Sequence, residues 1–262
     1  MARLTDKKGY ICDMDGVIYH GERLVEGAAE FVDWLKQEGK KFLFLTNSSA
    51  KSPLELKRKL SRMGIEVGAD DFYTSAQATA SFLAGQNPNA GVYVIGESGL
   101  INALYDAGFY NDSVDPTYVI VGESRTYNFE QVELAVHLVL KGARLIGTNS
   151  DLTGPTERGI APACRALIAP IELATGRKAY FIGKPNPLIM RHAIKKIGCR
   201  REETLIIGDR MDTDIIAGIE SEIETALVLS GITAREDLSL FAYQPDHVLD
   251  KAVDIIDHPG DK

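Results

Sequence analysis

The chain has 262 residues and a mass of 28.6 kDa, with 45% hydrophobic and 25% charged residues. This composition is typical of a globular protein and excludes a disordered, collagen-like or coiled-coil chain. The net charge of −8 argues against a nucleic-acid polymer as the main partner, because a phosphate backbone would be repelled, but a small phosphorylated ligand can still bind in a local cationic pocket.

Short β-rich runs alternate with helical stretches from the start of the chain. The first apolar run, Tyr10–Cys12, precedes a helix whose apolar residues recur at helical spacing over Ala28–Leu35 and which Gly39 ends. The next run, Phe42–Leu45, is continuously apolar, which is typical of a strand buried on both faces. Ser52–Glu55 then predicts a capping box, with proline at the first position of a second helix.

The same alternation continues to the end of the chain. The further predicted strands are Val92–Ile95, Tyr118–Val121, Leu145–Gly147, Tyr180–Ile182, Leu205–Ile207 and Ala226–Leu229. This order predicts an α/β fold built on a doubly wound parallel sheet, with the active site beyond the carboxyl ends of the strands. The length corresponds to about 1.7 domains at ~150 residues each. Since no low-complexity linker divides the chain, a second domain is expected to be inserted into the first.

Two acidic residues follow the first strand, in the run Asp13-Met14-Asp15-Gly16. Residues i and i+2 of an extended chain point to the same side, so the carboxylates of Asp13 and Asp15 are expected to converge, while Gly16 lets the chain turn away. Two carboxylates this close need a cation or a retained proton, and Mg²⁺ prefers oxygen ligands. An ordinary acidic turn explains the same run, because Asp and Gly are common turn residues.

Other polar residues follow two more of the predicted strands. Thr46 and Asn47 end the second strand, where a hydroxyl and an amide can donate hydrogen bonds to an anion. Lys184 stands in a stiff loop between Gly and Pro and can supply positive charge to a phosphate. The alternatives are a cap or turn for Thr46 and Asn47 and a solvated surface position for Lys184. Ser52 is already the expected cap, which favours binding by Thr46 and Asn47.

Three more acidic residues follow the strand Leu205–Ile207. Asp209 is expected at the same sheet edge as Asp13, whereas Asp212 and Asp214 begin a helix, where acids also complement the helix dipole. The strand ends together offer three carboxylates, a hydroxyl, an amide and a lysine. With Mg²⁺, this set is the one expected for phosphoryl transfer, in which an aspartate can be the nucleophile.

Four motifs at these strand ends resemble those of haloacid-dehalogenase-like phosphatases. They are Asp13-Met14-Asp15-Gly16-Val17, Leu45-Thr46-Asn47, Gly183-Lys184-Pro185, and Gly208-Asp209 with Asp214. The resemblance covers nearly the whole chain in order and looks closest to the NagD-like subfamily. The segments that support this subfamily are Gly27–Phe31, Tyr73–Ala76, Val119–Glu123 and Gly183–Pro187.

The resemblance implies catalytic roles for three residues. Asp13 is the expected nucleophile that attacks phosphorus. Asp15 is the expected acid that protonates the leaving group and then the base that activates water. Lys184 is expected to hold the nucleophile and the phosphate together. The chemistry is consistent with these residue types, because Asp15 must arrive protonated and the nearby Asp13 carboxylate raises its pKa.

The resemblance also implies the binding residues. Thr46 and Asn47 would bind the phosphoryl oxygens, together with Asp15 and Lys184. The implied cofactor is Mg²⁺, with three ligands and one supporting acid: the side chains of Asp13 and Asp209, the backbone carbonyl of Asp15, and Asp214 behind them.

These roles predict a Mg²⁺-dependent phosphatase that hydrolyses small phosphate monoesters, such as nucleoside monophosphates or sugar phosphates, through an aspartyl-phosphate. One alternative is a signalling module that stores phosphate on an aspartate, as two-component receivers do, although receivers are shorter and lack the Asp-x-Asp pair. Another is a phosphomutase of the same superfamily, which returns phosphate to a second sugar hydroxyl instead of water. The motifs do not choose the monoester or the breadth of specificity.

The resemblance predicts a Rossmann-like core domain over residues 1–76 and 183–262 and an inserted α/β cap over residues 77–182. The cap would select the leaving group. Gly147–Asp151 either faces the substrate or is a solvated loop, and the polar segment Leu152–Gly159 is expected to form a mobile rim. A homodimer through the cap is consistent with the subfamily, but the sequence does not establish the oligomeric state.

The cysteines and the amino-terminal residues indicate the compartment. The three cysteines, Cys12, Cys164 and Cys199, are far apart and include no CxxC pair, which is typical of a reducing compartment without disulfides. The first eight residues lack an apolar run of the signal-peptide type, and no stretch approaches 18 consecutive apolar residues. We therefore expect a cytoplasmic protein with no membrane partner.

Overall fold

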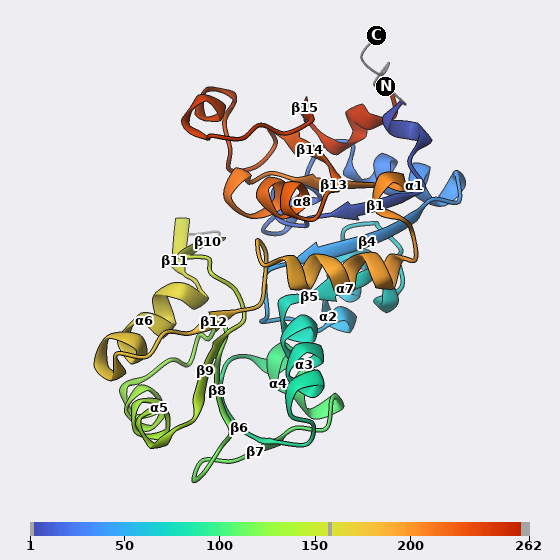
Figure 1. The fold of residues 1–262 in the computed structure, drawn as a ribbon. Helices are drawn as coiled ribbons and strands as arrows, with labels where there is room; N and C mark the ends of the chain where they lie inside the picture. The colour runs from blue at the N-terminus through green and yellow to red at the C-terminus, as the bar shows by residue number, and fades with distance from the viewer. Residues whose placement is uncertain (1–2, 157–158, 258–262) are drawn as a thin grey trace. The chain divides into compact units, whose positions relative to one another are not determined.

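The computed structural model describes residues 3–156 and 159–257. The chain divides into two compact units, each with its own sheet (Figure 1). The first, here called the core unit, consists of Met1–Thr46, Lys57–Tyr73 and Lys184–Lys262. The second, the inserted unit, consists of Asn47–Leu56 and Thr74–Gly183. Residues 47–56, which the sequence interpretation placed with the core, therefore cluster with the inserted segment.

The core unit is built on a six-stranded sheet with the order β15-β14-β13-β1-β4-β5. Its strands are β1 (Gly9–Cys12), β4 (Lys41–Thr46), β5 (Phe72–Thr74), β13 (Thr204–Gly208), β14 (Glu224–Val228) and β15 (His247–Leu249). The pairs from β15 to β4 are parallel, and Cys12 lies opposite both Ile207 and Phe44. The residues that follow these positions therefore leave the sheet at one edge.

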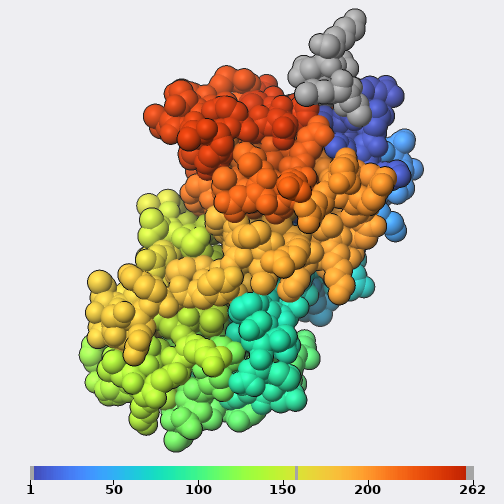
Figure 2. Space-filling model, in the orientation of Figure 1, coloured from blue at the N-terminus to red at the C-terminus, as the bar shows by residue number. Residues whose placement is uncertain are grey.

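Helices α1 (Ala28–Gln37), α7 (Pro187–Ile197) and α8 (Ile216–Glu220) belong to the core unit, and α2 (Pro53–Arg62) crosses the boundary between the units. The predicted capping box of α2 is confirmed, since the Ser52 N–H donates to Glu55 Oε2 at 2.8 Å. Helix α7 contacts both β4 and α8. In the space-filling view, α7 (orange) and the carboxyl-terminal segment (red) form a continuous surface of this unit (Figure 2).

Aromatic side chains join α1 to the central strand of the core unit. Tyr10 of β1 packs edge-on against Phe31 and Trp34 of α1, with ring centroids 6.4 and 5.6 Å away. Tyr10 and Phe31 are fully buried. Their burial is the reason for the helical spacing of apolar residues in α1, because full burial of one such side chain contributes ~1.5–3 kcal/mol.

Short elements complete the core unit. Strands β2 (Tyr19–His20) and β3 (Arg23–Leu24) form an antiparallel hairpin just after β1. A π-helical turn, Met211–Ile215, follows β13 and leads into α8. The described 3₁₀ turns are Leu4–Asp6, Ala69–Asp71, Arg201–Glu203, Arg235–Leu240 and Ala252–Ile255.

The inserted unit has a five-stranded, fully parallel sheet with the order β12-β9-β8-β6-β7. Its strands are β6 (Gly91–Ile95), β7 (Tyr110–Asn111), β8 (Tyr118–Val121), β9 (Arg144–Gly147) and β12 (Tyr180–Phe181). Its helices are α3 (Ser75–Gln86), α4 (Ser98–Asp106), α5 (Phe129–Lys141) and α6 (Cys164–Thr175). Helices α5 and α6 cover one face of the sheet and α3 and α4 the other (Figure 1).

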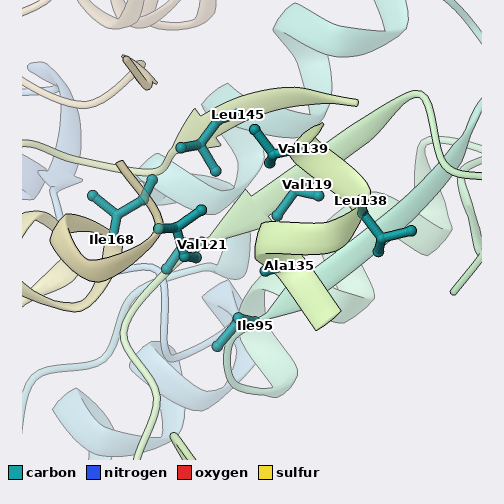
Figure 3. Close-up of a cluster of buried hydrophobic side chains, with 9 residues drawn as sticks. Ile95, Val119, Val121, Ala135, Leu138, Val139, Leu145 and Ile168 are labelled. Atoms are coloured by element: carbon teal, nitrogen blue, oxygen red, sulfur yellow. The ribbon is translucent and has the colours of Figure 1, made fainter. Parts of the chain in front are cut away.

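The core of the inserted unit lies between its sheet and helices α5 and α6. Val119 and Val121 of β8 and Leu145 of β9 pack against Ala135 and Val139 of α5 (Figure 3). The unit therefore has a hydrophobic core of its own, as a doubly wound sheet requires on each face. The α/β class and the doubly wound parallel arrangement predicted from the sequence are confirmed.

The segment expected as a mobile rim includes a β-hairpin. Strands β10 (Thr153–Thr156) and β11 (Gly159–Pro162) pair antiparallel, with Thr153 opposite Pro162, while residues 157 and 158 lie outside the described part of the chain. Backbone pairing gives this polar segment a regular structure that its composition did not reveal. Within residues 3–156 and 159–257, no helix combines the length and the apolar character needed to cross a bilayer.

Candidate active site

Asp13 lies at the edge of the core sheet, directly after β1. Its N–H donates to the carbonyl of Ile207 at 2.8 Å, so the backbone is held against β13 one residue beyond the end of the strand. The carboxylate is close to the residues that leave β13 and β4, because Cys12 lies in register with both strands. The apolar residues of β1, all of them buried, thus place a charged side chain at the edge of the sheet.

Lys184 connects two carboxylates in this site. Its Nζ donates to Asp13 Oδ1 and to Asp214 Oδ1, both at 2.6 Å, and to the carbonyl of Leu45 at 3.2 Å. The side chain is only 2% exposed, against 12% for Asp13 and 1% for Asp214. The interpretation of Lys184 as a solvated surface residue is therefore wrong, because all three donors of the ammonium have partners.

Lys184 owes its position to the start of α7. The side chain of Asn186 caps this helix by accepting a hydrogen bond from Leu188 N–H at 2.9 Å, and Pro187 occupies the first turn. Asparagine caps and early prolines are typical of helix starts. The run from Gly183 to Pro187 thus leads from the end of the inserted unit into α7. It also places Lys184 at the edge of the core sheet.

Asp209 follows β13 and is surrounded by glycines. Its Oδ2 accepts a hydrogen bond from Ile232 N–H at 2.8 Å. A Cβ on Gly16, whose φ is +83°, would lie 2.4 Å from this oxygen, and a Cβ on Gly231 would lie 2.1 Å from it. The Asp209 carboxylate therefore fits at this place only because Gly16 and Gly231 have no side chain.

Asp214 approaches the site from the π-helical turn. A Cβ on Gly208 would lie 2.1 Å from the Asp214 Cβ, so the glycine allows the turn to pack closely on the end of β13. The carboxylate also accepts a hydrogen bond from Arg210 N–H at 3.2 Å. Asp212 does not join it, because its side chain is 57% exposed and pairs with Arg210.

The electrostatics of the site follow from burial and charge. Burial raises the pKa of Asp13 well above its usual value; Lys184 opposes the rise, and Asp214 and Asp209 reinforce it. Burial, followed by the charge of Asp214, raises the pKa of Asp209 to about 7. Burial alone would lower the pKa of Lys184, but the carboxylates of Asp13 and Asp214 raise it overall, so the ammonium stays charged.

These residues fit a divalent cation. Asp13, Asp209 and Asp214 each offer a carboxylate oxygen within 4.8 Å of the others. One ammonium cannot balance three ionised carboxylates, and a divalent cation would neutralise the remaining charge. Oxygen-only donors favour Mg²⁺ over a soft metal, and the glycines around Asp209 leave space for its carboxylate.

Asp15 stands outside this group of carboxylates. The sequence interpretation expected alternation to bring Asp13 and Asp15 to one spot, but β1 ends at Cys12 and the chain turns at Gly16, whose N–H donates to Tyr19 O at 2.9 Å. The third acid near Asp13 is instead Asp214. Asp15 lies in the turn that precedes Tyr19, and the charges of Asp15 and Asp13, after burial, raise the pKa of that tyrosine.

Thr46 and Asn47 lie on opposite sides of the boundary between the units. Thr46 is the last residue of β4 and is buried in the core unit. Asn47 begins the inserted unit, where its Nδ2 donates to Asp151 Oδ2 at 3.0 Å. Its binding of phosphoryl oxygens therefore stays a prediction.

A polar network at the carboxyl ends of β8 and β9 holds the segment after Asn47. Glu123 accepts hydrogen bonds from the N–H and Oγ of Ser49 and from Asn149 Nδ2, and Asn149 also donates to the carbonyl of Asn47 at 2.7 Å. Asp151 N–H donates to Asn149 Oδ1 at 3.1 Å. The segment Gly147–Asp151 is thus a hydrogen-bonded part of the inserted unit, with Asn149 fully buried.

Two residues of the core site were missed from the sequence. Ser230 donates from Oγ to the carbonyl of Gly16 at 2.7 Å, and Gly231 packs on Asp209. Both follow β14, so the rule that polar residues at carboxyl ends of strands form the site would have found them. Small side chains are common in loops, however, and a glycine offers no chemical group that signals a role.

Comparison with known proteins agrees with this geometry. A model of haloacid dehalogenase-like hydrolases matches residues 10–110, and an HAD-hydrolase-like model matches residues 181–255. The dihydroxyacetone phosphatase of Corynebacterium glutamicum is 42% identical over 97% of this chain and 92% of its own length. The ribonucleotide monophosphatase NagD of Escherichia coli is 42% identical over 95% of this chain and 98% of its own. The chain belongs to the haloacid dehalogenase-like hydrolases.

This member of the haloacid dehalogenase-like hydrolases has the fold of solved relatives. The 4-nitrophenylphosphatase of Thermotoga maritima superposes with a TM-score of 0.93 at 32% identity, over 98% of this chain and 99% of the other. The NagD-like resemblance drawn from the motifs is confirmed. The chain is a hydrolase of the phosphomonoesterase class.

Proposed function

We propose that this chain is a Mg²⁺-dependent phosphatase that hydrolyses small phosphate monoesters through an aspartyl-phosphate on Asp13. The observation that supports it most directly is the buried contact of Lys184 with both Asp13 and Asp214, next to Asp209. A buried cation beside a partly exposed carboxylate is suited to bring a phosphate dianion to an anionic nucleophile.

In the first step, a carboxylate oxygen of Asp13 attacks phosphorus and the bond from phosphorus to the leaving oxygen breaks. Asp15 gives its proton to that oxygen, so an alcohol leaves and Asp15 becomes a carboxylate. Lys184 keeps Asp13 oriented and offsets negative charge as the new bond forms.

In the second step, water attacks the phosphorus of the aspartyl-phosphate while Asp15 takes a proton from it. The bond from phosphorus to Asp13 breaks, and inorganic phosphate is released with the Asp13 carboxylate restored. The same side chain acts first as acid and then as base, which requires a pKa near the working pH. Its location in the turn leaves Asp15 partly exposed, so that a leaving group and a water molecule can reach its carboxyl group.

The carboxylates of Asp13 and Asp209, supported by Asp214, would hold Mg²⁺, with the backbone carbonyl of Asp15 as a further ligand. The cation would supply charge neutralisation for the phosphate and the carboxylates. Thr46 and Asn47 would donate to the phosphoryl oxygens.

We further propose that the substrates are phosphate monoesters of small hydroxylated alcohols. The two relatives described above are named for dihydroxyacetone phosphate and for ribonucleotide monophosphates, and both leaving groups carry at least one free hydroxyl. Nucleoside monophosphates and sugar phosphates share this feature. The inserted unit, as a specificity domain, would select among them, and a homodimer through this unit stays a prediction.

The test is phosphate release from p-nitrophenyl phosphate, measured with Mg²⁺ and with EDTA. We expect many turnovers per protein molecule with Mg²⁺ and none with EDTA. Asp13→Asn should lower the rate at least about thousand-fold. Asp33→Asn is the matched control, because this aspartate is 64% exposed on α1. Full activity of Asp13→Asn would refute the assignment of the nucleophile.

Two further measurements separate the roles and the alternatives. Asp15→Asn should slow an alkyl phosphate by roughly 10²–10⁴-fold but p-nitrophenyl phosphate much less, because nitrophenolate leaves without a proton. Equal effects on both esters would contradict the acid role. Release of one nitrophenol per protein, with the phosphate retained on the chain, would indicate a storage module, and transfer between sugar hydroxyls without free phosphate would indicate a mutase.

A further inference from the structure

A cleft of about 580 Å³ opens in the inserted unit at the amino ends of three neighbouring strands. Its lining includes the first residues of β8, β9 and β12, which are Tyr118, Arg144 and Tyr180. Its floor is apolar and includes Val139 and Leu145, which lie together at the edge of the hydrophobic cluster (Figure 3). The volume is within the ~300–1,000 Å³ that small-molecule sites occupy.

Three cations and no acid line the described part of this cleft. The cations are Arg144, Arg177 and Lys178. In the part of the chain that the structure describes, none of them forms an ion pair; the nearby Glu172 is already bound by Arg165 and by Ala179 N–H. Three positive charges around one cleft repel one another, although Glu172 attracts the charge of Lys178, and the cluster contrasts with a chain whose net charge is −8.

The cations are not used to cap the neighbouring helices. Basic residues near a helix end often donate to its last carbonyls, and α5 and α6 both end beside the cleft, at Lys141 and Thr175. Arg144 donates from Nη1 to the hydroxyl of Tyr118 at 3.3 Å, and among the described residues its guanidinium has no other hydrogen-bond partner. Most N–H donors at this cleft are therefore available to a ligand.

Aromatic rings also line the cleft. The rings of Phe82 and Tyr180 pack at a centroid distance of 5.5 Å, and Tyr180 is 47% exposed. Arg144 lies over the ring of Tyr118 at 5.6 Å. An exposed ring next to unpaired guanidinium groups suits a ligand with a planar group at one end and several negative charges at the other.

We propose that this cleft binds a nucleoside triphosphate, with the base against Tyr180 and Phe82 and the phosphates among Arg144, Arg177 and Lys178. A single phosphate would leave most of the positive charge unbalanced, and an apolar ligand would leave all of it. The site is distinct from the polar network of Glu123 and Asn149, which follows the opposite, carboxyl ends of β8 and β9. The nucleotide therefore binds at a site other than the candidate active site around Asp13.

The test is equilibrium dialysis of the full chain with adenosine 5′-(β,γ-imido)triphosphate at low salt in EDTA. We expect one molecule bound per chain. The double variant Arg177→Glu/Lys178→Glu should weaken binding at least tenfold. Its matched control is Lys195→Glu/Lys196→Glu, which makes the same change of charge at two adjacent exposed positions of α7 and should bind normally.

Two further variants locate the ligand. Tyr180→Ala should weaken binding of the nucleotide but leave binding of inorganic tripolyphosphate unchanged. Asp13→Asn should bind the nucleotide normally, which separates this cleft from the candidate active site. Turnover of p-nitrophenyl phosphate by the Arg177→Glu/Lys178→Glu variant should equal that of the parent, which shows that the variant is folded.

Several results would overturn the proposal. The first is the absence of nucleotide binding to the parent chain. The second is an equal loss of nucleotide affinity in Arg177→Glu/Lys178→Glu and in the control Lys195→Glu/Lys196→Glu. The third is a loss of nucleotide binding in Asp13→Asn. Equal weakening of nucleotide and tripolyphosphate by Tyr180→Ala would refute the placement of the base.

Discussion

Replacement of Lys184 by methionine tests whether this ammonium holds the site together. The change keeps the length of the side chain but removes the charge that contacts Asp13 and Asp214, both at 2.6 Å. Because all three groups are largely buried, the carboxylates would lose their partner without gaining water. Breaking a buried pair in this way costs ~3–5 kcal/mol. In a chain of this size that lowers Tm by roughly 6–20 °C.

The loss should depend on pH. Without Lys184 the pKa of Asp13 in the folded state rises further above its unfolded value, so the folded variant retains a proton that the unfolded chain releases. Such a group favours the folded state at low pH, and this contribution is lost as the pH rises through the folded pKa. The difference between the variant and the parent should therefore be smaller at pH 5 than at pH 8.

Thermal unfolding followed by circular dichroism in EDTA measures both effects. Lys195→Met is the control, because Lys195 is exposed on α7. Adding Asp214→Asn to the Lys184→Met variant removes one of the two carboxylates left without a cation and should restore part of the lost thermal stability. A Tm for Lys184→Met within about 2 °C of the parent at pH 8, or a larger loss at pH 5 than at pH 8, would refute the reasoning.

Three more predictions concern the residues around the site. Gly231→Ala should lower Mg²⁺-dependent phosphate release at least tenfold, because the added Cβ would lie 2.1 Å from Asp209 Oδ2. The control Gly85→Ala, whose added Cβ has nothing within 4 Å, should leave the rate of phosphate release unchanged. Calorimetric titration should show Mg²⁺ affinity falling about tenfold per pH unit below 7, because Asp209, with a pKa of about 7, must release its proton to bind metal; an affinity independent of pH would contradict this. Glu123→Gln should destabilise the inserted unit by about 1–3 kcal/mol in urea unfolding, since it weakens the hydrogen bonds that Glu123 accepts from Ser49 and Asn149. Equal stability of parent and variant would contradict a stabilising role of this polar network.

Much of the fold and part of the candidate site could be predicted from the sequence. Apolar runs marked the parallel strands, and the carboxyl ends of those strands marked Asp13 and Asp209, because parallel strands deliver their last residues to one edge. Lys184 was identified by its stiff loop, but its burial was not, since nothing local distinguishes a buried lysine from a solvated one. Its burial depends on partners 171 and 30 residues away along the chain.

Two features needed the three-dimensional structure. The expected convergence of Asp13 and Asp15 assumed extended backbone, whereas the strand ends before both residues, and the acid that joins Asp13 and Asp209 in one group is Asp214. The division between Thr46 and Asn47 was also missed, because the segment after β4 is hydrogen-bonded to Glu123 and Asn149, which come much later in the chain. Long-range hydrogen bonds of this kind leave no periodic pattern in the sequence.

The aromatic packing of α1 on β1 gives the core unit a spectroscopic signature of its own. Trp34 is the single tryptophan of the chain, and it packs on Tyr10 and Phe31 in the core unit. Its fluorescence therefore reports the unfolding of that unit alone, whereas ellipticity sums the helices of both. Coincident transitions would show that the two units unfold as one cooperative system, and separate transitions would give the stability of each without dividing the protein.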